Sequence, residues 1–402
     1  MRCITWLCLS LALAFFPACS PASDISSAVD SQSPITLSVE SHAYDAFEAD
    51  KSALASFKLL AVGDNLIHEP IYTMARHTAA ALGQEGYNFL PSYAEVAEDI
   101  AAADVAFLEQ EVLVSGEDYL ISAWPSFNAP VELARDMREL GFDIVNLANN
   151  HILDKDIYCL ERTLEVWQEN SMPWIGVYDS RIASDALYTT TIEGCKVAFL
   201  GYTYGLNSWE FSDGLPFIIG NLFDRDRMQQ DIAAARSQAD LLVVSLHWGD
   251  EYQLQPSESQ RELALWLAEQ QVDLIIGHHS HVIQPAEVIE RPDGGRLTVV
   301  YSLGNFISCQ RRVESLLGLM LTIDAYQSAD GQWGFGVPQL KPLLSHYEHP
   351  DSDFPYVAVL PLAAYSEELA TKHDLASEAE NMSLATIQAL YESVIDKAYR
   401  PE

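Results

Sequence analysis

Five short segments of the chain each run from a continuous apolar stretch into carboxylate, amide or imidazole side chains. They span residues 59–64, 105–111, 144–151, 241–247 and 274–281. Runs this apolar suit strands that are covered on both faces of a sheet. Their polar ends would then meet at one rim, where open α/β sheets bind ligands. Because Asp, Glu, Asn and His are the ligand set of divalent metals, the segments predict a metal site at that rim.

The order of apolar runs and helical patterns predicts an α/β fold. Strands and helices alternate from residue 57 to 277, and strands dominate from about 285 to 340. Two sheets packed face to face with helices outside, an αββα sandwich, accommodate both halves. We expect this domain to span 57–342. A C-terminal helical extension over 343–402 would follow, with helical patterns at 358–371 and 380–398.

The first 19 residues have the pattern of a secretory signal, with Arg2, an apolar stretch over 6–16 and small residues at Ala18-Cys19. Residues 16–19 also resemble a lipoprotein box, in which Cys19 carries the lipid anchor; in an ordinary signal Cys19 is incidental. Residues 20–56 are typical of a flexible tether. We therefore expect an exported protein, periplasmic or at the cell surface.

Charge and cysteine content exclude some classes of function. The formal net charge is −36, which disfavours nucleic-acid partners because these require a basic surface. An anionic substrate would have to be attracted by a metal or by local basic residues. Past the signal only Cys159, Cys195 and Cys309 remain, and none lies in a Cys-x-x-Cys motif. We expect them to be buried small side chains.

Each polar cluster has a chemical and a structural interpretation. Asp64 can ligate a metal or cap the following helix. Asn150 can offer a neutral oxygen to a metal or stabilise its loop by hydrogen bonding. His247, after the largely apolar segment 241–246, can be a ligand or a satisfied core histidine. His279 and His281 can converge on a metal only if the backbone turns between them, and three histidines in four residues favour that interpretation.

The motifs together resemble the CapA family, which is linked to poly-γ-glutamate capsule synthesis. The resemblance covers about 57–325 and rests on motifs in matching order and spacing: Gly63-Asp64, Phe127-Asn128-Ala129-Pro130, Ala148-Asn149-Asn150-His151 with Asp154, His247-Trp248-Gly249 with Glu251, Gly277-His278-His279-Ser280-His281, and Tyr301-Ser302-Leu303-Gly304-Asn305-Phe306. The family domain looks like a divergent calcineurin-like metallophosphoesterase. That likeness implies the two-sheet sandwich.

The resemblance also implies roles for individual residues. It implies six metal ligands: Asp64, Glu111, Asn150, His247, His279 and His281. Glu111 stands where the phosphoesterase pattern has a bridging Asp; otherwise it is one of a pair of acidic loop residues with Glu109. His151, with Asp154, would act as the general acid.

Two features complete the predicted site. Glu251, Asn305 and Arg311 are the expected substrate-binding residues; Arg311 and Arg312 would form an anion clamp or a solvated pair. The phosphoesterase first motif, Asp-x-His, is broken because Leu66 stands in place of the His. His68 and Glu69 are the nearest substitutes.

Two functions follow from this pattern. The first is a cell-envelope hydrolase of capsule metabolism that uses one or two divalent ions (Mn, Fe or Zn) and acts on an anionic polymer such as poly-γ-glutamate or on a phosphoester. The second is a non-catalytic protein that binds the polymer or a membrane synthase partner, and Leu66 motivates it.

Overall fold

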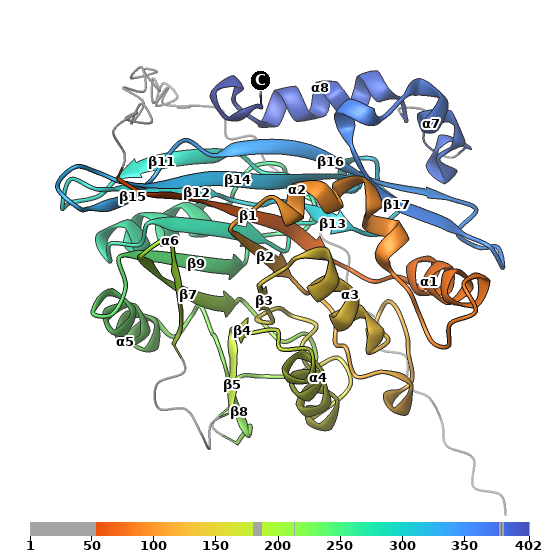
Figure 1. The fold of residues 1–402 in the computed structure, drawn as a ribbon, viewed down its shortest axis with the longest axis horizontal. Coiled ribbons are helices and arrows are strands. Elements are labelled where there is room, and N and C mark those ends of the chain that lie inside the picture. Colours follow the sequence, from red (N-terminus) through yellow and green to blue (C-terminus); the bar gives the residue numbers. More distant parts are fainter. Residues whose placement is uncertain (1–53, 180–186, 213, 378, 380–381, 402) are drawn as a thin grey trace, which may run out of the picture. The chain divides into compact units, whose positions relative to one another are not determined.

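Two β-sheets form the centre of the molecule (Figure 1). The computed structural model describes residues 54–401 apart from 180–186, 213, 378 and 380–381. All of them belong to one compact unit that spans 45–402. The expected signal, the lipid anchor at Cys19 and nearly all of the tether lie outside the described residues.

The larger sheet has nine strands, ordered β17-β16-β14-β1-β2-β3-β4, with β13 paired to β1 and β15 paired to β14. Strands β1 to β4 are parallel, and β14, β16 and β17 are antiparallel. The strands are β1 (Ser56–Asn65), β2 (Val105–Glu109), β3 (Ile144–Asn146), β4 (Trp174–Ile175), β13 (Asn305–Ile307), β14 (Leu317–Gln327), β15 (Trp333–Phe335), β16 (Gln339–Glu348) and β17 (Tyr356–Pro361).

The second sheet has six strands in the order β11-β12-β10-β9-β7-β6. They are β6 (Tyr188–Ile192), β7 (Cys195–Thr203), β9 (Leu241–His247), β10 (Leu274–His278), β11 (Ala286–Glu290) and β12 (Arg296–Val300). β6 and β7 form the hairpin predicted from Glu193-Gly194, and both turn residues have positive φ. A separate pair consists of β5 (Val177–Asp179) and β8 (Phe217–Ile219).

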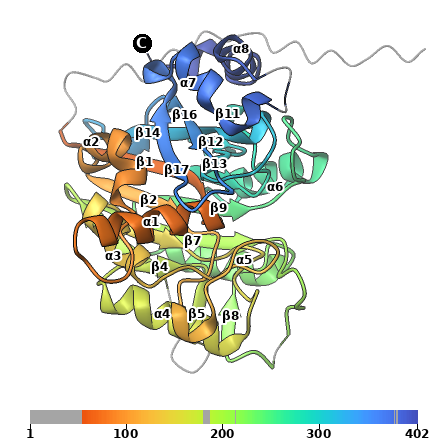
Figure 2. The ribbon, with the colours of Figure 1, turned by 90° about the vertical axis from the view of Figure 1, so that its right-hand side faces the viewer.

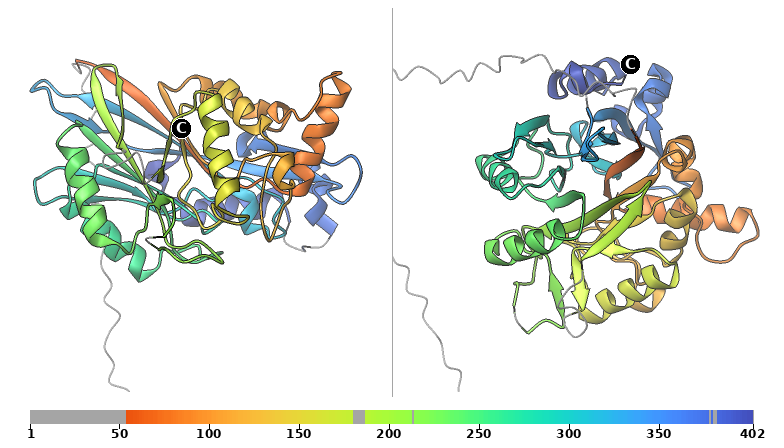
Figure 3. Two further views of the ribbon diagram at one scale, coloured as in Figure 1. Left: turned by 90° about the horizontal axis from the view of Figure 1, so that it is seen from below. Right: turned by 60° about the vertical axis from the view of Figure 1, so that its left-hand side comes forward.

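Helices lie outside the sheets (Figures 1 and 2). They are α1 (Glu69–Ala81), α2 (Ala97–Ala101), α3 (Glu132–Leu140), α4 (Ile157–Glu169), α5 (Arg225–Arg236), α6 (Glu258–Glu269), α7 (Glu367–Lys372) and α8 (Leu384–Val394). α5 and α6 lie against the six-stranded sheet, and α7 and α8 lie near the nine-stranded sheet (Figure 3). α6 begins at a capping box formed by Ser257 and Gln260.

Successive side chains of a strand point to opposite faces of the sheet, and this alternation explains why the six-stranded sheet borders two hydrophobic cores. In β9, Leu241 and Val243 join the core shared with the nine-stranded sheet, whereas Leu242 and Val244 pack in the core under α5 and α6. Every residue of β9 is buried, as expected for a strand covered on both faces. The predicted α/β fold with two packed sheets is therefore confirmed.

The tail differs from the expected helical extension. The first part of the helix predicted over 358–371 is strand β17, which pairs with β16 inside the nine-stranded sheet. This sheet therefore continues past residue 342, where we placed the end of the domain. Val357 and Val359 are β-branched and buried, which favours a strand in this short apolar run. The second predicted helix corresponds to α8.

Cys159 and Cys195 are buried as expected, and Cys309 is half-buried; all three are free thiols. Burial raises the pKa of Cys159 to about 11 and that of Cys195 to about 12, so both stay protonated. In the part of the chain that the structure describes, no helix is both long enough and apolar enough to cross a membrane.

Candidate metal centre

The strand register brings the polar ends of both sheets to one place. In the nine-stranded sheet, Asp64 lies opposite Glu109, and Glu109 lies opposite Asn146. In the six-stranded sheet, His247 lies opposite His278. Parallel strands end at the same edge, so the carboxyl ends of β1, β2, β3, β9 and β10 form the rim that the sequence predicts.

Two groups of metal-ligating side chains meet at this rim. Glu111, His247 and His279 form the first, and Asp64, Glu111 and His281 form the second; in each group the ligand atoms lie within 4.8 Å of one another. Glu111 belongs to both, so its carboxylate can bridge two cations. Asn150 stands beside the first group, with Oδ1 2.8 Å from His247 Nε2. The structure thus brings all six predicted metal residues together.

The backbone turn required at the histidine loop is present. His279 has φ 87° and His281 has φ 57°, in the left-handed region that non-glycine residues rarely adopt. The two rings approach to 6.1 Å between centroids, and His279 lies 4.8 Å from the ring of His247. Strain of this kind persists where the surrounding structure fixes a functional geometry.

Burial and neighbouring charges shift the pKa values of the acidic groups in the site. Burial raises the pKa of Glu111 well above its ordinary value, and the charges of Asp64 and Glu109 raise it further. Burial also acts to raise the pKa of Asp64, but contacts with His278 and His281 outweigh it and lower that pKa. Three buried carboxylates close together oppose one another's ionisation unless a cation lies between them.

The imidazoles are in the state that metals bind. Burial lowers the pKa of His247 well below its ordinary value and that of His279 to about 3, so both rings are neutral at physiological pH. Among the residues that the structure describes, both oxygens of Glu111 and Nδ1 of His279 are buried without a hydrogen-bond partner. Buried polar atoms are rarely left so, and a divalent cation would satisfy them. The residues present therefore fit a site for one or two cations.

A layer of buried side chains supports these ligands. Asn305 Oδ1 lies 3.0 Å from His281 Nδ1, which leaves His281 Nε2 facing Glu111. Glu109 Oε1 lies 3.3 Å from Nδ1 of His247. Metal-ligating histidines are commonly oriented in this way through their second nitrogen. Neither Glu109 nor His278 was assigned a role from the sequence, although Glu109 alternates with Glu111 and His278 precedes His279.

His151 and Asp154 form a pair at the edge of the metal centre. His151 Nδ1 lies 2.6 Å from Asp154 Oδ2, and the same oxygen accepts the backbone N–H of Phe127 at 2.8 Å. The Phe127 ring packs edge-on against the imidazole at 4.9 Å. Asn207, which the sequence did not single out, donates to Asp154 Oδ1 at 3.3 Å. Because Nδ1 is engaged with Asp154, Nε2 is the nitrogen left for chemistry.

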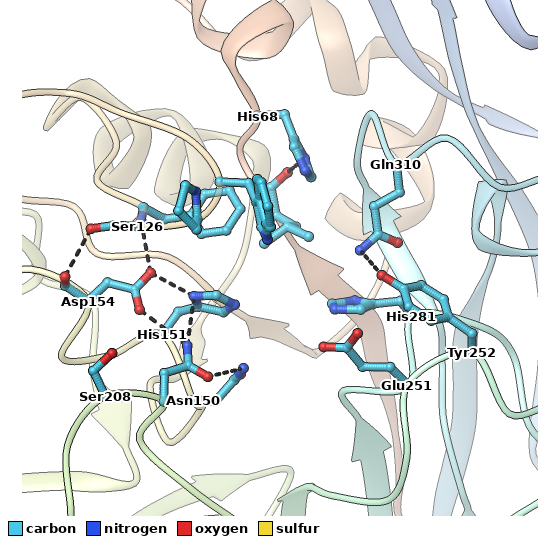
Figure 4. A pocket seen from close by; sticks show the side chains of 15 residues that line it. His68, Ser126, Asn150, His151, Asp154, Ser208, Glu251, Tyr252, His281 and Gln310 are labelled. Atoms are coloured by element: carbon cyan, nitrogen blue, oxygen red, sulfur yellow. Dashed lines mark hydrogen bonds and ion pairs between the residues drawn. The ribbon is translucent and has the colours of Figure 1, made fainter. Parts of the chain in front are cut away.

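A cavity of about 630 Å³ opens beside the metal centre (Figure 4). Its walls include Asn150, His151 and Asp154 on one side and Glu251, Tyr252 and His281 on the other. Aromatic and apolar side chains of Trp124, Pro125 and Phe127 line a further part. The described lining contains no Lys or Arg.

Of the three expected substrate-binding residues, the structure places one in the cavity lining. Glu251 lines the cavity. Asn305 does not: it is only 1% exposed, its register partner is the buried Asp64, and its Oδ1 contacts His281 Nδ1. Arg311 is absent from the cavity lining and pairs with Asp374 at 2.9 Å, so the structure does not place this expected anion clamp at the cavity. Arg312 instead lies over the ring of Tyr252, 4.3 Å from its centroid.

Residues around the broken first motif do not supply a ligand in place of its missing histidine. Leu66 is buried and lines the cavity. The His68 ring lies in the cavity wall with Nδ1 3.1 Å from the Leu66 carbonyl oxygen, and burial lowers its pKa to about 4. Glu69 is exposed and lines a different cavity.

Comparison with known proteins gives relatives of two kinds. The chain is 29% identical over 178 residues to the PGA biosynthesis protein CapA of Bacillus subtilis (strain 168), which covers 44% of this chain and 45% of that protein. It is 30% identical over 185 residues to the capsule biosynthesis protein CapA of Bacillus anthracis, with 45% and 43% covered. The matched segment therefore spans less than half the length of either relative.

Among solved structures, an NAD nucleotidase of Haemophilus influenzae superposes with a TM-score of 0.41 at 14% identity, covering 84% of this chain and 66% of that one. The family model described as "Bacterial capsule synthesis protein PGA_cap" matches residues 58–310, more than half of the chain and the part that carries every metal-centre residue. The chain belongs to this bacterial capsule synthesis family.

Proposed function

We propose that this protein is a metal-dependent hydrolase of the cell envelope that acts in capsule or poly-γ-glutamate metabolism, on a phosphoester or an anionic polymer. One observation carries the proposal: Glu111 is shared by two buried triads of metal-ligating groups beside a His–Asp pair at a cavity. Two cations bound there would supply electrophilic activation of the scissile group and of an attacking water.

The residues of the chain would divide the remaining work. Asp64, Glu111 and His281 would hold one cation, and Glu111, Asn150, His247 and His279 the other. Asp154 fixes the His151 ring through Nδ1, so that Nε2 can deliver a proton to the leaving group. Phe127 limits the rotation of that ring. Glu251, across the cavity, would contact the substrate.

Export is a further part of the proposal. Residues 1–19 would direct the chain out of the cytoplasm, and Cys19 would carry a lipid that holds it at the membrane. A nearby synthase and its anionic polymer would then be the partners. The mass of the mature chain tests this part. Cleavage of the signal lowers the mass by that of the removed residues, and attachment of a lipid raises it by that of the acyl groups.

The test of catalysis combines metal analysis with hydrolysis of bis(p-nitrophenyl) phosphate by the purified protein. We expect His151→Asn to lower kcat by about 10²- to 10⁴-fold, because it removes the general acid. Its cation content should equal that of the wild type. The matched control is His349→Asn, an exposed histidine at φ 51° whose backbone suits Asn. An unchanged kcat in His151→Asn would refute the assigned role.

A non-catalytic role has one observation in its favour. Leu66, which lines the cavity, stands where the phosphoesterase first motif has a histidine ligand. If the protein only binds polymer or a synthase, cells carrying His151→Ala should make as much capsule as the wild type, whereas deletion of the chain abolishes capsule. Equal loss in both strains would support catalysis.

A further inference from the structure

A row of four buried side chains links the two groups of candidate metal ligands. It alternates carboxylate and imidazole: Asp64, His278, Glu109 and His247. Asp64 Oδ1 is 3.4 Å from His278 Nδ1, His278 Nε2 is 3.8 Å from Glu109 Oε2, and Glu109 Oε1 is 3.3 Å from His247 Nδ1. The side chains of all four are 0% exposed.

The ends of this row are metal ligands and its middle is not. Asp64 belongs to one triad and His247 to the other, whereas His278 and Glu109 belong to neither. The register explains the arrangement, since Asp64 pairs with Glu109 across β1 and β2, and His247 pairs with His278 across β9 and β10. The row therefore spans both sheets as well as both metal positions.

The middle of the row has unused hydrogen-bonding capacity. Within the described chain, both ring nitrogens of His278 and Oε1 of Glu109 are buried without a hydrogen-bond partner. Glu109 Oε2 is already held by Asn146 Nδ2 at 2.6 Å, so this side chain is fixed in position. A histidine with two orphaned nitrogens between two carboxylates is costly as a purely structural element.

We propose that His278 and Glu109 are positioning residues that hold ligands of both cations at once and so couple the two metal positions. His278 orients Asp64 through Nδ1, and Glu109 orients His247 through Nδ1, leaving His247 Nε2 toward Asn150 and Glu111. In this role the two residues would restrain the side chains of Asp64 and His247, which would be cation ligands. The inference rests on the cation positions of the proposed function, not on hydrolysis.

Two variants of His278 separate its two contacts. Asn places its amide where Nδ1 lies, and Gln reaches the position of Nε2. We expect His278→Asn to keep the cation at Asp64 and to weaken the one at His247 by about 10- to 100-fold, the usual effect of losing such a support. His278→Gln should weaken the cation at Asp64 instead. Glu109→Gln, of the same size, should weaken the cation at His247.

The measurement is Mn²⁺ titration of the purified chain by calorimetry, with electron paramagnetic resonance to detect coupled pairs of ions. The matched control is Ser245→Ala, because Ser245, in the neighbouring strand β9, is likewise buried with an unpartnered Oγ but lies outside the row. Wild type and control should show two coupled Mn²⁺ ions; the His278 variants should fill one position at a time. Thermal unfolding in EDTA establishes that each variant is folded. If a His278 variant is not folded, the Mn²⁺ affinity of Glu109→Gln tests the proposal in its place.

Folded variants that bind both Mn²⁺ ions as tightly as the wild type would overturn this inference and leave the proposed hydrolase intact. Two ions bound without hydrolysis would overturn the hydrolase and leave the positioning pair. A wild-type chain that binds no Mn²⁺ would overturn both.

Discussion

Arg311 and Arg312 are adjacent in the chain but lie in different surroundings. Arg311 pairs with Asp374, 63 residues further along, whereas the Arg312 guanidinium lies over Tyr252, which lines the cavity. We expect Arg312→Gln to raise KM for an anionic substrate by about two- to five-fold, the effect of losing one exposed charge–charge attraction of about 0.5–1 kcal/mol. Arg311→Gln should change KM less than about twofold, because Arg311 is absent from the cavity lining and pairs with Asp374.

Steady-state kinetics at low and high salt test the pair. The effect of Arg312→Gln should shrink at high ionic strength, since screening weakens an attraction between exposed charges. Equal effects from the two substitutions would contradict this division of roles. The sequence alone could not make the distinction, because Asp374 and Tyr252 are both distant in the chain and only the fold decides which arginine meets which.

At the scale of the elements, apolar runs predicted the strands well where both faces are buried. β9 and β10 are buried at every position, and their boundaries fall within a few residues of the expected ones. The run at 356–361 was misassigned because a short apolar stretch has no clear period, and its pairing with β16 is a tertiary contact. The gathering of candidate ligands at strand ends was predictable for the same reason as the strands.

The turn after β10 is the element on which both triads depend. His279 sits at φ 87°, a conformation that Asn adopts more readily than most residues. His279→Asn should therefore remove a ligand of one triad without adding backbone strain. We expect the variant to lose one cation relative to the wild type and to keep the metal-free melting temperature.

Metal analysis after dialysis, together with thermal unfolding in EDTA, checks this expectation. A variant that retains the full cation content would show that His279 is not a ligand. A large fall in the metal-free melting temperature would show instead that the ring is needed for packing against Tyr204, whose ring centroid lies 4.4 Å away.

At the scale of the whole molecule, the sequence predicted which ligands gather but not what holds them. Convergence follows from strand topology, which puts the carboxyl ends of the parallel strands β1, β2, β3, β9 and β10 at one rim. The supporting roles of Glu109, His278 and Asn305 depend on which nitrogen of each histidine faces which neighbour. No spacing in the chain encodes that orientation.

The molecule concentrates buried negative charge at the centre of an already acidic chain, with a net charge of −36. Burial, and after it the charge of Asp64, raises the pKa of Glu109 and of Glu111 well above the ordinary 4.5. A raised pKa means that the folded, metal-free protein favours the protonated carboxyl. The stability contributed by that protonation is present below pH 4.5 and is lost as the pH rises through the raised values.

Cations bind the ionised carboxylates, so their effect has the opposite slope. We expect the difference in melting temperature between Mn²⁺ and EDTA samples to be small at acidic pH and to grow toward alkaline pH. At 100-fold excess over Kd the stabilisation is about 2.7 kcal/mol, enough for a shift of several degrees. Glu111→Gln should abolish both the shift and its pH dependence, because it removes the shared carboxylate. A shift that is constant with pH, or largest in acid, would show that these buried carboxylates do not bind the metal.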